Sequence, residues 1–506
     1  MSRLFVNDDF QCCVTRLYHD GYRPGEATAQ DVRDYVHRLK DTQTTDFIFN
    51  VNAQLSYAPS RVWQTAGDKY LKETENGVPV NFKASYLMVW YDLFVRQNID
   101  LYAIWIEELR GMGIRPWMSF RMNDTHDNGV VSGGIRRSDY TYSARSRGLT
   151  RMRHREKSGY YDDCLDFALD DVRRHHLDYI REQLDRYDVD GVELDWMREP
   201  FCFAPGGELE GAAILTDFMR AVKALVHEAE TRYGHKILLG VRVMRDPQDT
   251  LDVGLDVFSW AKEGLIDWVV PTPRWETADS DIPVALWRAV LPPAVGLAMG
   301  TDIRYMARPG GSCVMMTPEL VAGLAMQALS NGADGIYLFN YTYLPDPALE
   351  ALKYIGNREM LSHHARRHVV SFQDIAAPFN RPSQPLPMPL EENTVNPGWS
   401  MLAIQTGQVN GRATLRLGFL KGLTAADVSV FMNGAPCRLI GREESTKHHG
   451  AVGVDPQAFG VESASLCETD VWEYAPECVR QGRQVIELKA TSGTLDYAEL
   501  RVDPER

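Results

Sequence analysis

The chain has 506 residues, of which 44% are hydrophobic and 24% charged, and its formal net charge is −15 at pH 7. This composition is typical of a globular protein with an ample core and more than one structural unit. The acidic balance argues against nucleic-acid binding, because phosphate contacts need a basic surface. The sequence has no run of about 18 apolar residues, so we expect no contact with a membrane.

The N-terminus and the cysteines bear on the compartment. The first nine residues, Met1–Asp9, turn polar too early for the apolar part of a secretory leader. We therefore expect a cytoplasmic protein, or a periplasmic or secreted one if a leader is missing from this chain. The eight cysteines are scattered and form no CxxC pair, which indicates buried free thiols rather than a disulfide framework or zinc ribbon.

From residue 1 to about 360, short β-branched or aromatic runs alternate with helical patterns. Such alternation predicts βα units around a parallel sheet. Eight repeats predict a (β/α)8 TIM barrel. The candidate strands are Leu4–Asn7, Asp46–Asn52, Ile114–Arg121, Gly191–Trp196, Ile237–Val243, Trp268–Thr272, Val295–Gly300 and Gly335–Asn340.

Helix signals lie between these strands. Thr28 is a candidate N-cap, and Leu177, Ile180 and Leu184 fall on one helical stripe. Thr317-Pro318 predicts a helix start with proline in its first turn, and the helix should end at Asn331-Gly332.

After the barrel, the composition changes twice. Prolines at 378, 382, 385, 387 and 389 indicate a connector. Beyond about residue 390, strands and turns predict a small antiparallel β-sandwich, with Asn410-Gly411 and Asn433-Gly434 marking turns. The expected strands are Trp399–Gln405, Ala413–Leu417, Val428–Met432, Cys437–Ile440, Gln484–Lys489 and Ala498–Val502. We thus expect a catalytic barrel over 1–375, a connector over 376–392 and an accessory sandwich over 393–506.

The fourth candidate strand carries the strongest functional signal. Alternate side chains of a strand share a face, so Glu193 and Asp195 point one way while Val192 and Leu194 point the other. In a barrel the apolar pair should meet the helices and the carboxylates should face the mouth. Active sites of TIM barrels lie at the carboxyl ends of the strands. Asp195 is therefore the first candidate catalytic residue and Glu193 the second, with a structural ion pair as the alternative for Glu193.

The segments Leu165–Arg173, Tyr187–Arg198 and Gly254–Pro271 resemble the family-10-like glycosyl hydrolase proteins. The resemblance extends over most of residues 1–345 and implies a barrel that acts on glycosides. Two better-known patterns are absent. Chitinase-like barrels have a catalytic glutamate where this chain has Met197, and Val295–Asp302 lacks the strand-seven nucleophile glutamate of the large retaining group. The remaining likeness is to α-galactosidase-type barrels, in which a strand-four aspartate attacks and a later carboxylate is the acid/base.

Glycoside hydrolysis needs a second carboxyl group beside Asp195. Glu276, after strand six, is the first choice as proton donor. Asp302, Asp246 and Asp124 follow other strands and stay open. Glu193 is also open as the acid, because a carboxylate neighbour raises a pKa toward the working pH.

Further polar and aromatic residues near strand ends suit sugar binding, since sugars present hydroxyls and flat C–H faces. His126 with Asp124 also has the chemistry of a metal ligand pair, but so short a spacing is common, and we predict no metal or other cofactor. The predicted substrate-binding residues are Asn52, Trp63, Arg121, Asn123, Asp124, His126, Trp196, Arg242, Arg274, Trp275, Asp302, Asn340 and Tyr341.

The loop after strand three is basic: eight Arg or Lys residues lie from Arg136 to Lys157. It predicts an anionic substrate, such as a uronate or sulfated sugar, or else a solvated loop or one that docks on an acidic neighbouring subunit of a homo-oligomer.

Together these features predict a glycoside hydrolase with a carbohydrate substrate. Two alternatives stay open: a lyase, epimerase or metal-dependent hydrolase on the same barrel, and a non-catalytic glycan-binding protein that uses the sandwich.

Overall fold

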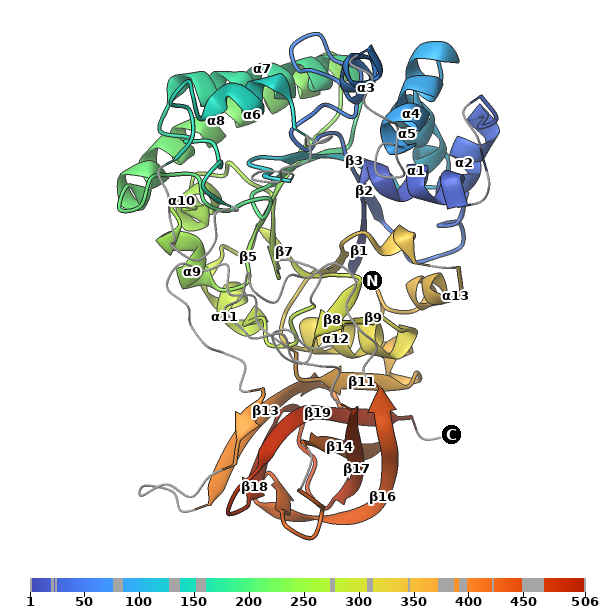
Figure 1. Ribbon diagram of the computed structural model, residues 1–506, viewed down its shortest axis with the longest axis vertical. Coiled ribbons are helices and arrows are strands. Elements are labelled where there is room, and N and C mark those ends of the chain that lie inside the picture. The colour runs from blue at the N-terminus through green and yellow to red at the C-terminus, as the bar shows by residue number, and fades with distance from the viewer. Residues whose placement is uncertain are drawn as a thin grey trace.

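The computed structural model describes residues 2–19, 22, 25–75, 85–126, 137–151, 161–273, 278–306, 313–344, 346–371, 386–390, 398–420, 423–447 and 468–504. Figure 1 shows a ring of strands surrounded by helices, with a second, all-strand part below it.

Eight parallel strands close into a barrel, in the order β1-β10-β7-β6-β5-β4-β3-β2. All eight strands predicted from the sequence are confirmed, with ends that agree to within two residues. Their bounds are β1 (Arg3–Asp8), β2 (Asp46–Asn50), β3 (Arg115–Arg121), β4 (Gly191–Asp195), β5 (Leu238–Met244), β6 (Trp268–Thr272), β7 (Gly296–Thr301) and β10 (Gly335–Leu338). The TIM-barrel fold is thus established.

Aromatic side chains fill the barrel interior near the amino ends of the strands. Phe5 packs edge-on against Trp117 and Trp268, with ring centroids 5.8 and 4.9 Å away. The facing positions are glycines: a Cβ on Gly191 would lie 2.1 Å from the Trp117 ring. Large rings on some strands therefore require glycine on their neighbours, and the polar site is confined to the other end of the barrel.

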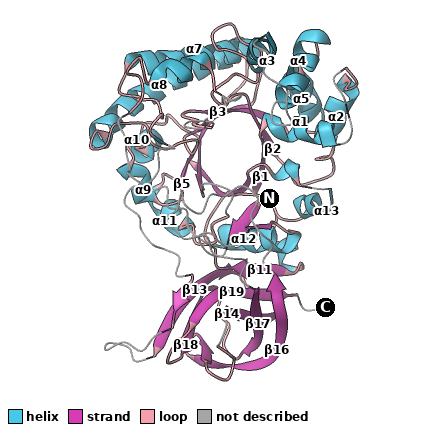
Figure 2. Ribbon diagram, in the orientation of Figure 1, coloured by secondary structure: helices cyan, strands magenta, loops and turns pink. Residues whose placement is uncertain are grey.

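Helices surround the strands, as Figure 2 shows. The predicted N-caps are confirmed, because Thr28 accepts from the Asp31 backbone N–H and Thr317 from that of Leu320. The α-helices are α1 (Phe10–His19), α2 (Ala29–His37), α3 (Ala66–Glu75), α4 (Ser85–Tyr91), α5 (Leu101–Gly111), α6 (Asp139–Ala144), α7 (Asp170–Arg186), α8 (Glu208–Tyr233), α9 (Pro247–Asp252), α10 (Val257–Lys262), α11 (Val284–Val290), α12 (Pro318–Ser330), α13 (Asp346–Leu349) and α14 (Arg358–Ser362).

Three shorter helical segments and a hairpin complete the barrel part. A π-helical segment follows α4 at Asp92–Arg96, and 3-10 turns occupy Tyr341–Tyr343 and Glu350–Lys353. Strands β8 (Arg304–Met306) and β9 (Cys313–Met315) pair as a hairpin between β7 and α12.

The C-terminal part is an antiparallel β-sandwich, as predicted. Its strands run in the order β11-β19-β14-β17-β16-β15-β18-β13, and β12 pairs with β19. The long strand β16 pairs with both β15 and β17, so it joins the two sides around one apolar core. The bounds are β11 (Arg366–Val369), β12 (Met388–Pro389), β13 (Trp399–Gly407), β14 (Arg412–Phe419), β15 (Ser429–Met432), β16 (Ala435–Lys447), β17 (Glu468–Pro476), β18 (Gly482–Lys489) and β19 (Thr494–Asp503).

The sandwich packs on the barrel through α12, which lies between them in Figure 1. Contact is close: a Cβ on Gly323 of α12 would lie 2.1 Å from the Arg367 carbonyl oxygen of β11. Strand β11 belongs to the C-terminal sheet although its residues precede the connector expected from the sequence.

Two further features are the state of the cysteines and the length and polarity of the helices. Six described cysteines are free thiols, and Cys12, Cys13, Cys164 and Cys202 are buried. In the described part of the chain, every helix is too short or too polar to cross a bilayer.

Candidate active site at the barrel mouth

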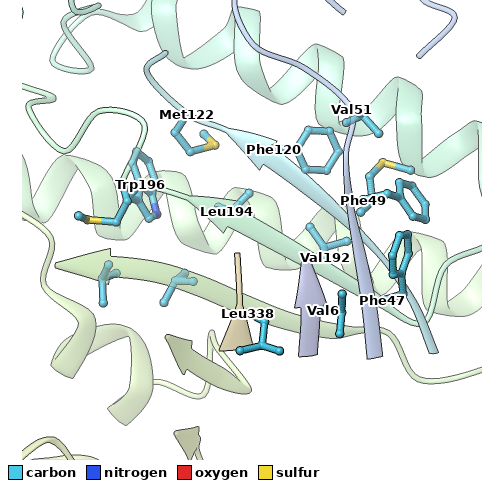
Figure 3. Packing of buried hydrophobic residues seen from close by; sticks show 14 of the residues in the cluster. Val6, Phe47, Phe49, Val51, Phe120, Met122, Val192, Leu194, Trp196 and Leu338 are labelled. Carbon is cyan, nitrogen blue, oxygen red and sulfur yellow. The ribbon is translucent and has the colours of Figure 1, made fainter. Parts of the chain in front are cut away.

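Strand β4 places two carboxylates inside the barrel. Glu193 lies in register with Ser119 of β3, and Asp195 lies between Arg121 of β3 and Arg242 of β5. Val192 and Leu194 pack among the apolar side chains outside the strands, as Figure 3 shows. The alternation predicted from the sequence therefore holds in the structure.

Glu193 is buried and accepts two hydrogen bonds at one oxygen. Ser119 Oγ donates to Oε1 over 2.7 Å, and the hydroxyl of Tyr337 on β10 donates to the same oxygen over 3.0 Å. Burial, followed by the charge of Asp195, raises the pKa of Glu193 to about 7. A carboxyl group with such a pKa holds its proton near neutral pH and can act as a general acid.

Asp195 is a buried carboxylate with a donor at each oxygen. Arg242 Nη1 donates to Oδ2 over 2.9 Å, and the Met197 backbone N–H donates to Oδ1 over 2.9 Å. The Arg242 guanidinium also lies 4.0 Å from the centroid of the Phe339 ring, a cation–π contact that helps to hold it in place. These two hydrogen bonds fix the orientation of the Asp195 carboxylate, as a nucleophile or general base requires.

A second polar network lies at the ends of β1, β3 and β10. Arg121 donates through Nη2 to Asp9 over 2.5 Å and through Nη1 to Asp124 over 3.1 Å. Asn340 Nδ2 donates to Asp9 over 2.9 Å, and His126 Nδ1 lies 2.8 Å from Asp124. The structure therefore brings Arg121, Asp124, His126 and Asn340 together, as their places at strand ends suggested.

The charges of this network determine its protonation. Burial raises the pKa of Asp124, but His126 and Arg121 outweigh burial and hold the pKa well below its usual range. Burial likewise raises the pKa of Asp9, and Arg121 and Arg198 bring it below the ordinary value. Both groups are thus carboxylates at neutral pH, and neither can donate a proton.

Asp302 follows β7 on another side of the mouth. It is 7% exposed, accepts the Ile303 backbone N–H over 2.7 Å and acts electrostatically on Arg242. The predicted residue Asp302 therefore belongs to the same charged cluster as Asp195.

Two predicted aromatic platforms do not face the mouth. Trp196 is fully buried and packs against Phe167, Phe218 and Trp260 on the helix side, where Figure 3 places it beside Leu194. Trp63 stacks on Tyr179 and His175 of α7, with ring centroids 4.4 and 4.5 Å apart. Trp196 therefore lies outside the candidate site, and the ring of Trp63 is already stacked on protein side chains.

Three polar residues predicted to bind substrate form hydrogen bonds with backbone groups instead. Asn52 donates to the Arg121 carbonyl and accepts its N–H, which joins the ends of β2 and β3. Asn123 donates to the carbonyls of Leu165 and Phe201. Tyr341 is buried and donates to the Ala348 carbonyl. These contacts support the loops of the mouth rather than reach into it.

The first-choice proton donor Glu276 and its neighbours Arg274 and Trp275 lie outside the described residues, as do residues 127–136 and 152–160 of the basic loop. The described arginines of that loop have partners or ring contacts. Arg137 and Arg145 both pair with Asp163, and Arg147 lies over Tyr140.

Sequence reasoning missed three residues of the site. Asp9 comes directly after β1, so its position at a strand's carboxyl end was the signal that could have found it. Ser119 lies two residues before Arg121 on β3, deeper in the barrel. Only the pairing of the barrel strands brings Ser119 and Tyr337 beside Glu193.

Metal binding is limited to what the described residues offer. No group of three or more His, Cys, Asp or Glu side chains with metal-holding geometry occurs among them. His126 and Asp124 form an ion pair of 2.8 Å with each other.

No protein-family model and no curated protein sequence matches the chain. Solved structures with a similar fold include several glycoside hydrolases. The glycoside hydrolase domain of PgaB (BpsB) from Bordetella bronchiseptica shares 12% identity over 71% of this chain and 99% of that one, with a TM-score of 0.43. A family GH18 chitinase from Chromobacterium violaceum shares 12% identity over 99% and 89%, with a TM-score of 0.38.

An Anoxybacillus α-amylase shares 10% identity over 95% of this chain and 99% of that one, with a TM-score of 0.39. At these identities and TM-scores, the likeness carries no information about the activity of this chain. The resemblance to the family-10-like group stays a prediction.

Proposed function

We propose that this protein is a glycoside hydrolase in which Asp195 is the nucleophile or general base. The observation that carries the proposal is the buried carboxylate pair Glu193 and Asp195 at the carboxyl end of β4, with Asp195 held by Arg242. Hydrolysis of a glycoside needs one carboxylate and one protonated carboxyl group. The two residues have environments that separate these roles, since only Asp195 is paired with a cation.

We assign the proton donor to Glu193, which the sequence left open beside Glu276. Both hydrogen-bond donors to Glu193 meet Oε1, and no described donor is assigned to Oε2. Its raised pKa supports the assignment, because a useful general acid is protonated at the working pH. Glu276 and Asp302 are the competing donors.

The assignment is tested with aryl glycosides that differ in leaving group. Glu193→Gln should lose about 10²- to 10⁴-fold in kcat/KM on substrates with poor leaving groups, the usual range for general acid catalysis. It should lose far less on dinitrophenyl glycosides, because their leaving groups need no proton. Glu276→Gln and Asp302→Asn, measured alongside, should not show this dependence.

The pH profile gives an independent check. For the wild type, kcat/KM should fall as pH rises above about 7, because the acid loses its proton there. That descending limb should be absent in Glu193→Gln. If the limb persists, or if Glu276→Gln shows the leaving-group dependence instead, Glu193 is not the donor.

Activity should survive a chelator, and loss of activity would favour the metal-dependent hydrolase.

A further inference from the structure

A segment after β6, Ala278–Ile282, lies at the mouth of the barrel and is called the rim segment. On its barrel side, the carboxylate of Asp279 forms a buried ion pair with Arg245, and their side chains are 0% and 9% exposed. Arg245 also donates to the Asp281 carbonyl. Arg245 directly follows β5 and stands three residues after Arg242. The rim segment thus contacts the end of β5, the strand whose Arg242 binds Asp195.

The other side of the rim segment is bonded to the C-terminal sandwich. Ser371, two residues after β11, accepts the Ser280 backbone N–H over 2.8 Å, and its own N–H donates to Ser280 Oγ over 3.2 Å. The two hydroxyls lie 3.1 Å apart. Gln405 of β13 donates to Asp281 over 3.1 Å. All four of these hydrogen bonds join a strand or strand end of the sandwich to the rim segment.

Helix α12 adds a third contact at the same place. Gln327 donates to the Ser280 carbonyl over 2.7 Å, and both residues are buried. Both backbone polar groups of Ser280 are therefore satisfied by side chains from outside the segment. A buried N–H that loses its acceptor destabilises its conformation, so these side chains determine where the segment rests.

We propose that the C-terminal sandwich positions the active site, with Ser371 as the positioning residue. Ser371 holds the rim segment, the segment's Asp279 holds Arg245, and Arg245 fixes the end of β5 from which Arg242 binds Asp195. The inference rests on the proposed function for its kinetic consequence. It differs from a sandwich that acts as a separate glycan-binding module.

The physical part is tested by hydrogen–deuterium exchange of the full chain. In Ser371→Ala, the Ser280 N–H loses its acceptor, so exchange in peptides covering 278–284 and 243–247 should rise on the order of tenfold. Ser330→Ala is the matched control. Its hydroxyl accepts from Gln408 of the same sandwich, at the end of α12 that leads to the amino end of β10, and it should leave both peptides unchanged. Unchanged exchange in Ser371→Ala would overturn the proposal whether or not a substrate is known.

The catalytic part is tested by kinetics on an aryl glycoside that the wild type hydrolyses. Ser371→Ala should lower kcat about tenfold with KM within about twofold, since it disturbs the catalytic carboxylate rather than ground-state binding. Asp279→Asn should lower kcat similarly, and the double variant should be no worse than Asp279→Asn because both act through one path. Additive losses, a change confined to KM, or faster exchange with full kcat would overturn it. If Asp195→Asn keeps activity while these effects appear, the proposed chemistry fails and the positioning stands.

Discussion

At the scale of single residues, the partners of each carboxyl group decide what it can do. Asp9, Asp124 and Asp195 meet Arg121 or Arg242, whereas Glu193 meets only hydroxyl donors. The same rule separates Asp8, the last residue of β1, from Asp9, which follows it. Asp8, on the outer side, receives hydrogen bonds from Tyr35 and Thr342, and burial raises its pKa to about 7.

The raised pKa of Asp8 predicts a pH dependence of stability. Because the folded state binds this proton more tightly than the unfolded state does, its contribution to stability is lost as pH rises from about 4 to about 7. In Asp8→Asn that loss is removed. The difference in Tm between pH 5 and pH 8, measured by calorimetry, should therefore be smaller in the variant. A variant and wild type with the same pH dependence would show that Asp8 titrates normally.

At the scale of elements, the strands could be predicted from the sequence better than the packing of the side chains. All eight barrel strands followed from apolar runs and helix caps. The alternation that turned Glu193 and Asp195 inward also turns Trp196 outward, so its role as a sugar platform contradicted the pattern itself. The strand β17 escaped prediction, and β11 pairs with β19 over a long sequence separation that no local pattern reveals.

The glycines facing Trp117 give a prediction for the barrel strands. A Cβ at Gly191 would lie 2.1 Å from the Trp117 ring, whereas at Gly240 the nearest ring atom is 3.3 Å away. Gly191→Ala should therefore cost about 1–3 kcal/mol or more of unfolding free energy through overpacking. Gly240→Ala, which faces the same Trp117 ring, should cost clearly less. Urea unfolding measures both, and equal costs would contradict the packing described for this layer.

At the scale of the whole molecule, the sandwich and the barrel are joined by buried polar contacts as well as by packing on α12. The Ser280–Ser371 pair and the close approach of Gly323 to Arg367 both cross the boundary. The sequence predicted both parts but not the interface between them, because the contacting residues Ser280, Ser371 and Gly323 belong to no motif.

These contacts predict cooperative unfolding. Calorimetry of the full chain should show one main transition, since the sandwich cannot leave α12 without exposing groups buried on both sides. Ser371→Ala should shift that transition only slightly. Two well-separated transitions in the wild type would mean that the sandwich is an independent module.

Asp195 is the residue on which the proposed mechanism depends most. With the substrate identified from a glycoside panel, Asp195→Asn should reduce kcat by at least about 10³-fold, because the variant cannot attack or activate water. Its circular dichroism should match the wild type, since an amide keeps the side-chain volume. Near-normal turnover in a correctly folded Asp195→Asn would contradict the proposed mechanism.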